Sequence, residues 1–155
     1  MVQASGVRVA WVDLPLDVRT AVEEILGSAV VEAVSQPGGF SPGSADRVVA
    51  ADGRRAFVKA VGGSLNPHSP GLHRREIAVS EGMPTSPAFP ELLGSWEGRA
   101  DDGDWVALVL ADVEGRHPRL PWEAAELEAV REALESVARV PLTGGLAGLT
   151  GTGAG

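Results

Sequence analysis

The spacing of apolar residues along the chain changes several times, and each spacing predicts a different element. Between Pro15 and Gly27 apolar residues recur every three to four positions, as in an amphipathic helix. Proline suits the first turn of such a helix, and glycine suits its end. The spacing then shortens, and turn-forming residues separate the apolar runs. These runs predict strands at residues 30–35, 46–51 and 54–61, with a hairpin turn at Asp52-Gly53 between the last two.

The second half of the chain again contains both the helical spacing and the shorter spacing of strands. Ser69 is a good N-cap, and Pro70 a good first residue, for a helix that ends at Gly82. Strands follow at residues 92–98 and 105–110, and a last helix follows at 122–140. The strand at 105–110 is apolar throughout, which predicts burial on both faces of a sheet.

This order of elements predicts an α+β fold built on an antiparallel sheet of about five strands. One helix lies at the N-terminus, one between strands 3 and 4, and one at the C-terminus. The residues after Pro141 are uncharged, rich in glycine and without a period, which predicts a flexible tail at 142–155. We expect the four tryptophans to pack in the core: Trp11, Trp96, Trp105 and Trp122.

Composition narrows the classes of function. The 155 residues, 44% hydrophobic and 22% charged, suit one globular domain. A net charge of -8 argues against a nucleic-acid partner, and no apolar run of about 18 residues suggests a membrane span. No cysteine is present, which excludes disulfides and thiolate chemistry. The histidines lack metal-ligand spacing, so we expect His68 and His73 to be solvated and no metal to be bound. We expect a cytoplasmic protein.

Lys59 is the most informative single residue. It is the only lysine among 13 basic residues, and it interrupts an apolar strand in which Phe57 and Val61 share its face. A buried ammonium group is costly unless it is paired, and a lysine is well suited to reach a phosphate. The other interpretation is a surface lysine on an edge strand.

Glu76 is the matching residue of opposite charge. We phase the helix that begins near Pro70 so that its core stripe is Leu72, Glu76, Val79 and Met83. A carboxylate then occupies a position where the pattern requires an apolar side chain. We therefore predict an ion pair between Glu76 and Lys59. If the phase is wrong by half a turn, Glu76 instead faces solvent.

Two further segments have features that could contribute to a nucleotide-binding site. The Gly-rich run before the second strand holds glycines whose backbone can approach a phosphate closely, although most such runs are only hairpins. Its candidate residues are Gly38, Gly39, Phe40, Ser41 and Gly43. The strand at 105–110 leads into a polar turn, where the backbone of Ala111, Asp112 and Val113 could hold a flat heterocycle. Taken alone, that segment is simply a strand that ends in a loop.

The order of these features is Gly-rich hairpin, strand lysine, helix glutamate and strand-to-turn edge, which is the layout of a kinase N-lobe. Four segments resemble the N-terminal lobe of the bacterial aminoglycoside phosphotransferase family. They are Gly38-Gly39-Phe40-Ser41-Pro42-Gly43, Ala56-Phe57-Val58-Lys59-Ala60, Arg74-Arg75-Glu76 and the stretch from Val106 to Pro118.

The resemblance implies a role for each segment. Lys59 would bind the α- and β-phosphates of ATP, and Glu76 would orient Lys59. Residues 38 to 43 would cover the phosphates, and the backbone near Ala111 to Val113 would hold adenine. The chain then divides into an N-terminal helical segment (1–28), a nucleotide-binding N-lobe (29–113), a hinge with the following helix (114–141) and the Gly-rich tail (142–155).

The sequence departs from the family in one respect. Members continue into a C-terminal lobe with a His-Gly-Asp-type catalytic loop and a later aspartate that binds magnesium, but none of the three histidines here precedes Gly-Asp. We therefore expect a truncated lobe that binds nucleotide, holds no catalytic residue or metal ligand and is inactive alone. A missing C-terminal lobe or a homodimer would be its partner. The alternative is a non-enzymatic interaction module, or pseudokinase fragment, that kept the N-lobe fold.

Overall fold

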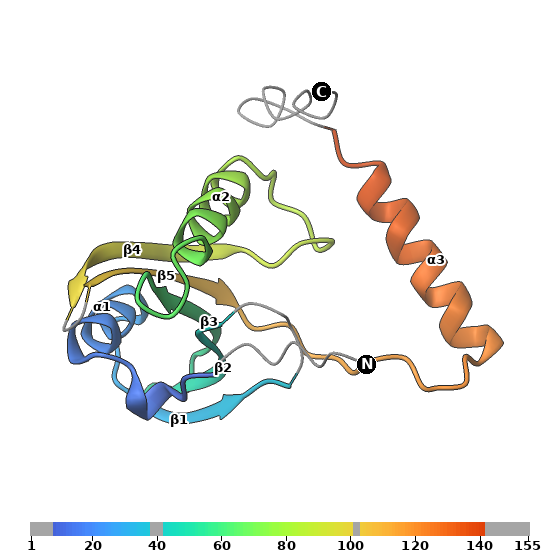
Figure 1. Ribbon diagram of the computed structural model, residues 1–155. Helices are drawn as coiled ribbons and strands as arrows, with labels where there is room; N and C mark the ends of the chain where they lie inside the picture. The colour runs from blue at the N-terminus through green and yellow to red at the C-terminus, as the bar shows by residue number, and fades with distance from the viewer. Residues whose placement is uncertain (1–7, 38–41, 101–102, 142–155) are drawn as a thin grey trace, which may run out of the picture.

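A computed structural model describes residues 8–37, 42–100 and 103–141, which form a five-stranded antiparallel sheet and three α-helices (Figure 1). The predicted α+β fold is therefore confirmed. The strand order is β1-β2-β3-β5-β4, so β1 and β4 are the edges. The elements are η1 (Trp11–Asp13), α1 (Leu16–Leu26), β1 (Val30–Ser35), β2 (Ser44–Ala50), β3 (Arg55–Gly62), α2 (Ser69–Glu81), β4 (Leu92–Ala100), β5 (Gly103–Ala111) and α3 (Ala124–Ala138).

The sheet carries a helix on each face, and β4 and β5 lie between α1 and α2 in Figure 1. The alternation of side chains along β3 explains this arrangement, because neighbouring residues point to opposite faces. Ala56, Val58 and Ala60 point into the α1 layer and are fully buried. The larger core cluster forms there, around Val18 and Val22 of α1.

The α2 face has a smaller apolar cluster. Ile77 of α2 packs on Val106, Leu108 and Leu110 of β5, with Phe57 at the margin. Residues 105 to 110 are all buried, because β5 lies inside the sheet and has a helix on each side. The predicted burial of this strand on both faces is confirmed.

The phase predicted for α2 is wrong by one position. Leu72 is 59% exposed, whereas the buried positions of the helix are Ser69, Pro70, His73 and Ile77. The expectation that His73 is solvated is wrong for the same reason. Its ring nitrogen Nδ1 lies 3.1 Å from the carbonyl oxygen of Ser69, so the buried imidazole has a polar partner one turn earlier. The prediction failed because it assigned the leucine, rather than the histidine, to the core.

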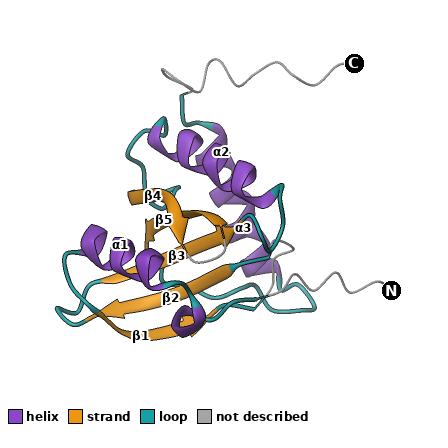
Figure 2. Ribbon diagram, turned by 60° about the vertical axis from the view of Figure 1, so that its left-hand side comes forward, coloured by secondary structure: helices purple, strands orange, loops and turns teal. Residues whose placement is uncertain are grey.

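The last helix stands apart from the sheet in Figure 1, whereas in the turned view of Figure 2 it is partly hidden behind the sheet. None of the residues of α3 is buried, and Leu127, Leu134 and Val137 are exposed. Trp122, just before the helix, is 52% exposed, so the expectation that it packs in the core is wrong, although Trp11 and Trp105 are buried. None of the helices in the described ranges combines the length and apolarity that crossing a membrane requires.

Candidate functional site

The predicted ion pair between Lys59 and Glu76 is present. The Nζ atom of Lys59 lies 2.5 Å from Oε2 of Glu76, and the two side chains are 28% and 36% exposed. Lys59 does not lie on an edge strand, because β3 pairs with β2 and β5. Glu76 reaches it from a position beside the buried stripe of α2, next to Ile77. The pair is therefore half-buried and open to solvent on one side.

His73 adds a third titratable group to this part of the molecule. Burial lowers the pKa of its imidazole, and the positive charge of Lys59 lowers it further. The nearby Glu76 carboxylate acts in the opposite direction, as does the hydrogen bond to Ser69. The imidazole is therefore neutral at physiological pH, so Lys59 and Glu76 supply the charge at this site.

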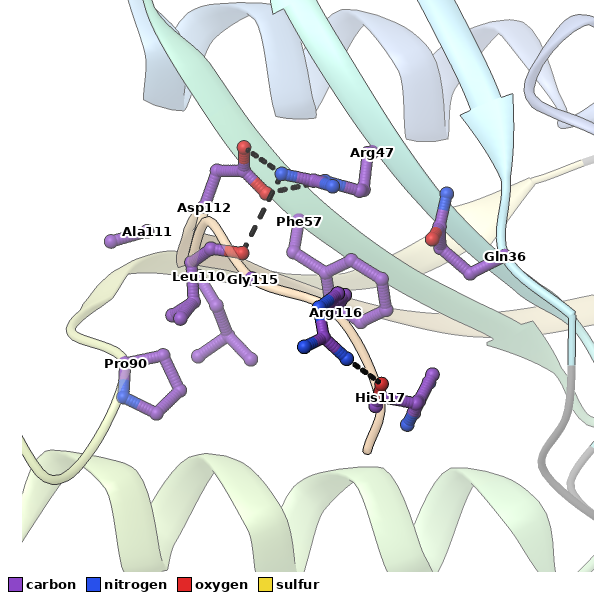
Figure 3. A pocket seen from close by; sticks show the side chains of 11 residues that line it. Gln36, Arg47, Phe57, Pro90, Leu110, Ala111, Asp112, Gly115, Arg116 and His117 are labelled. Carbon is purple, nitrogen blue, oxygen red and sulfur yellow. Dashed lines mark hydrogen bonds and ion pairs between the residues drawn. The ribbon is translucent and has the colours of Figure 1, made fainter. Parts of the chain in front are cut away.

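A cavity of about 410 Å³ opens on the face of the sheet that carries Lys59 (Figure 3). Phe57 lines it, two residues before Lys59 and opposite Leu110 in the adjacent strand. We call this space the Phe57 cavity. Its other lining residues are Gln36, Arg47, Pro90, Leu110, Ala111, Asp112, Val113, Gly115, Arg116 and His117. An apolar ring and a few polar groups around a space of this size are typical of small-molecule sites.

The predicted backbone segment from Ala111 to Val113 forms one wall of the Phe57 cavity. The N–H of Ala111 donates to the carbonyl of Glu91 at 2.8 Å, which fixes the end of β5. The Asp112 side chain is only 6% exposed because Arg47 and Arg55 both bind it. Hydrogen bonds from Arg47 are the largest cause of a lowered pKa for Asp112. Its carboxylate is thus bound within the protein by two arginine side chains.

The Gly-rich run is described only in part. Gly38, Gly39, Phe40 and Ser41 lie outside the described residues. Gly43 is described, with φ of 109°, and a Cβ there would lie 2.3 Å from the carbonyl oxygen of Ala60. Glycine is therefore required at this position by both conformation and space.

The position of the hairpin follows from the strand register. Ala45, two residues after Gly43, pairs with Lys59. The N–H of Val9 also donates to the carbonyl of Gly43 at 3.2 Å. The hairpin therefore leaves the sheet beside Lys59, with the N-terminal segment against its base.

Several lining residues were not predicted from the sequence. The alternation of side chains along β3 predicts that Phe57 and Lys59 share one face of the sheet. It does not predict that Phe57 lines a cavity. Arg47 interrupts the apolar run of β2, and this interruption was a further signal in the sequence. Arg116 and His117 follow β5 in an irregular segment, and no sequence pattern places them at the cavity.

Within residues 8–37, 42–100 and 103–141, no group of three histidine or acidic side chains could hold a metal ion. No protein-family model matches the chain, and no curated protein matches its sequence. The geometry of the site and the four resembling segments are therefore the basis for a function.

Proposed function

We propose that this domain binds ATP as the nucleotide-binding lobe of a small-molecule kinase similar to the aminoglycoside phosphotransferases. One observation carries the proposal: the Lys59–Glu76 ion pair lies on the same face of the sheet as the Phe57 cavity. An ammonium group for the phosphates and a cavity for the base then lie side by side.

Each part of the site has a chemical task in this proposal. Glu76 holds the Lys59 ammonium in place, and the ammonium takes the phosphates as a compact point charge. The ring of Phe57 supplies an apolar surface on which a flat base can stack. The backbone from Ala111 to Val113 supplies polar groups at the edge of the base. The resemblance assigns the cover of the phosphates to residues 38–43, of which the structure describes Pro42 and Gly43.

Transfer of the γ-phosphoryl group to a hydroxyl acceptor also requires a group that orients the acceptor, and magnesium on the phosphates. The described residues do not fit a protein-held magnesium, since no three suitable side chains gather among them. The sequence also contains no His-Gly-Asp motif. We therefore assign nucleotide binding to this chain, in the cytoplasm, and assign no chemical step to it.

The direct test is calorimetric titration of ATP with magnesium into the wild type and Lys59→Ala. We expect the substitution to reduce affinity at least tenfold, because Lys59 is the only lysine in the sequence. Arg74→Ala is the matched control, since Arg74 is a cation of α2 that pairs with Glu97 on β4. Equal affinities for the wild type and Lys59→Ala would refute the proposal.

A second candidate function rests on α3. Its stripe of apolar side chains, Leu127, Leu134 and Val137, is 54%, 65% and 40% exposed. Such a surface is typical of protein interaction sites, and it favours a non-enzymatic interaction module or pseudokinase fragment. Light scattering after gel filtration, together with the ATP titration, distinguishes the nucleotide-binding lobe from the interaction module. A stable dimer that dissociates on Leu134→Glu and binds no ATP would favour the module.

A further inference from the structure

The chain leaves the sheet at Ala111, and side chains rather than strand pairing then control its path. Residues 112–123, which we call the β5–α3 segment, form no helix or strand. The segment nevertheless contributes Asp112, Val113 and Arg116 to the Phe57 cavity. Whatever holds this segment therefore also controls the shape of the cavity.

Arg47 is the main residue that holds it. Its Nε atom donates to Oδ1 of Asp112 and its Nη2 atom to Oδ2, both at 2.7 Å. The same Nη2 atom lies 3.5 Å from the carbonyl oxygen of Val113. Arg47 belongs to β2, and β3 separates that strand from β5 in the sheet. One arginine side chain thus crosses a strand to bind the segment that forms the cavity wall (Figure 3).

Burial distinguishes this contact from an ordinary surface ion pair. The Asp112 side chain is 6% exposed and that of Arg47 is 30% exposed. Two parallel bonds between a guanidinium and a carboxylate fix orientation as well as distance. Arg55 supports the same carboxylate, with Nε 3.0 Å from Oδ2, but it does not line the Phe57 cavity.

We propose that Arg47 is a positioning residue that holds the backbone of Asp112 and Val113 in the geometry that accepts the base of a nucleotide. The inference rests on the proposed nucleotide function and extends it to the residue that shapes the base site. Arg47 acts on the base alone, because the phosphates are assigned to Lys59 on the adjacent part of the sheet. The affinity for a ligand with phosphates but no base should therefore not change when Arg47 is substituted.

The experiment compares ATP with inorganic tripolyphosphate, which lacks the base and sugar. We expect Arg47→Gln to weaken ATP binding about tenfold and to leave tripolyphosphate binding within about twofold of wild type. Arg47→Lys should behave like Arg47→Gln, because lysine keeps the charge but loses the two parallel bonds. Arg54→Gln is the control, since Arg54 pairs with Asp52 in the β2–β3 turn.

Two outcomes of these titrations would overturn the inference. One is unchanged ATP affinity in Arg47→Gln, and the other is an equal loss of ATP and tripolyphosphate. The unchanged tripolyphosphate affinity expected for Arg47→Gln also excludes a general loss of folding.

A second readout separates this inference from the proposed function. NMR order parameters of the backbone amides at residues 113–116 need no ligand, and we expect them to fall in Arg47→Gln while those of β5 are unchanged. If the wild type binds neither ATP nor tripolyphosphate, the proposed function is wrong. Unchanged order parameters at residues 113–116 would show that Arg47 does not hold the segment.

Discussion

Glu76 binds Lys59 from a helix position beside the buried stripe of α2, not from within it. The adjacent residue, Ile77, is 7% exposed and packs on β5, and it thereby fixes the rotation of the helix. The carboxylate is consequently directed at β3 while it remains partly exposed. Packing of an apolar neighbour, more than the ion pair itself, therefore sets the position of this charge.

Glu76→Gln should weaken ATP binding about threefold to tenfold with little loss of stability. The carboxylate orients the ammonium for the phosphates, but a half-exposed ion pair contributes at most about 1 kcal/mol to folding. Calorimetric titration and urea unfolding measure the two effects. Glu81→Gln is the control because Glu81 is an exposed residue at the end of the same helix. A large loss of stability in Glu76→Gln would contradict this prediction.

Phe57→Ala should weaken ATP binding about tenfold and leave tripolyphosphate binding unchanged. Stacking of a base on an aromatic ring contributes about 1–3 kcal/mol, and the phosphates do not contact the ring. Phe57→Tyr keeps the ring and should retain most of the affinity. If Phe57→Ala and the wild type bind ATP equally well, the base does not lie in the Phe57 cavity.

Stability should fall as the pH drops below about 6.5, the ordinary pKa of histidine. Because burial lowers the pKa of His73, the unfolded chain binds more protons than the folded chain in this range, and acid therefore favours unfolding. Urea unfolding at about pH 7.5 and about pH 5.5 measures the difference. His73→Phe should reduce it, whereas His68→Ala, at an exposed position, should not. An identical pH dependence in His73→Phe and wild type would exclude His73 as the cause.

Gly43→Ala should destabilise the domain by about 3 kcal/mol, because the added methyl group meets the backbone of β3 in a left-handed conformation. Gly53→Ala is the matched control. Gly53 also has a positive φ, of 87°, but no atom lies within 4 Å of its Cβ position. That substitution should cost only about 1 kcal/mol. Thermal unfolding of both variants tests the difference, and equal losses would show that the contact with Ala60 is relaxed.

Labelled γ-phosphate of ATP should not be transferred to any hydroxyl acceptor by this chain alone. The site supplies a cation and a base cavity, and neither activates an acceptor hydroxyl. A panel of aminoglycosides and other polyols provides the assay. Turnover that disappears in Lys59→Ala would show that a catalytic carboxylate lies within this sequence.

The sheet could be predicted largely from local patterns, because the apolar run at 105–110 and the Asp52-Gly53 turn each specify one local arrangement. The phase of α2 could not. Leu72 is exposed and His73 is buried, since the imidazole finds a carbonyl partner on its own helix. A pattern that ranks residues by apolarity has no information on such a partner.

Some residues of the candidate site could likewise be predicted from the sequence, and others could not. Lys59 and Glu76 were detectable because each interrupts an apolar pattern. The bond between Arg47 and Asp112 joins residues 65 positions apart, on β2 and after β5. Predicting it requires the strand order, because Arg47 must cross β3 to reach Asp112. Long-range side-chain pairs of this kind emerge only once the sheet is assembled.

The hydrogen bond from Val9 to Gly43 has a practical consequence for anyone who handles this protein. It places the beginning of the described chain against the base of the glycine-rich hairpin, beside Ala45 and Lys59. The described chain therefore begins, at Arg8, close to the proposed phosphate site. A polyhistidine tag at the amino end would bring its own cations and metal affinity to a titration with ATP. Tag-free protein is the appropriate material for every binding measurement described above.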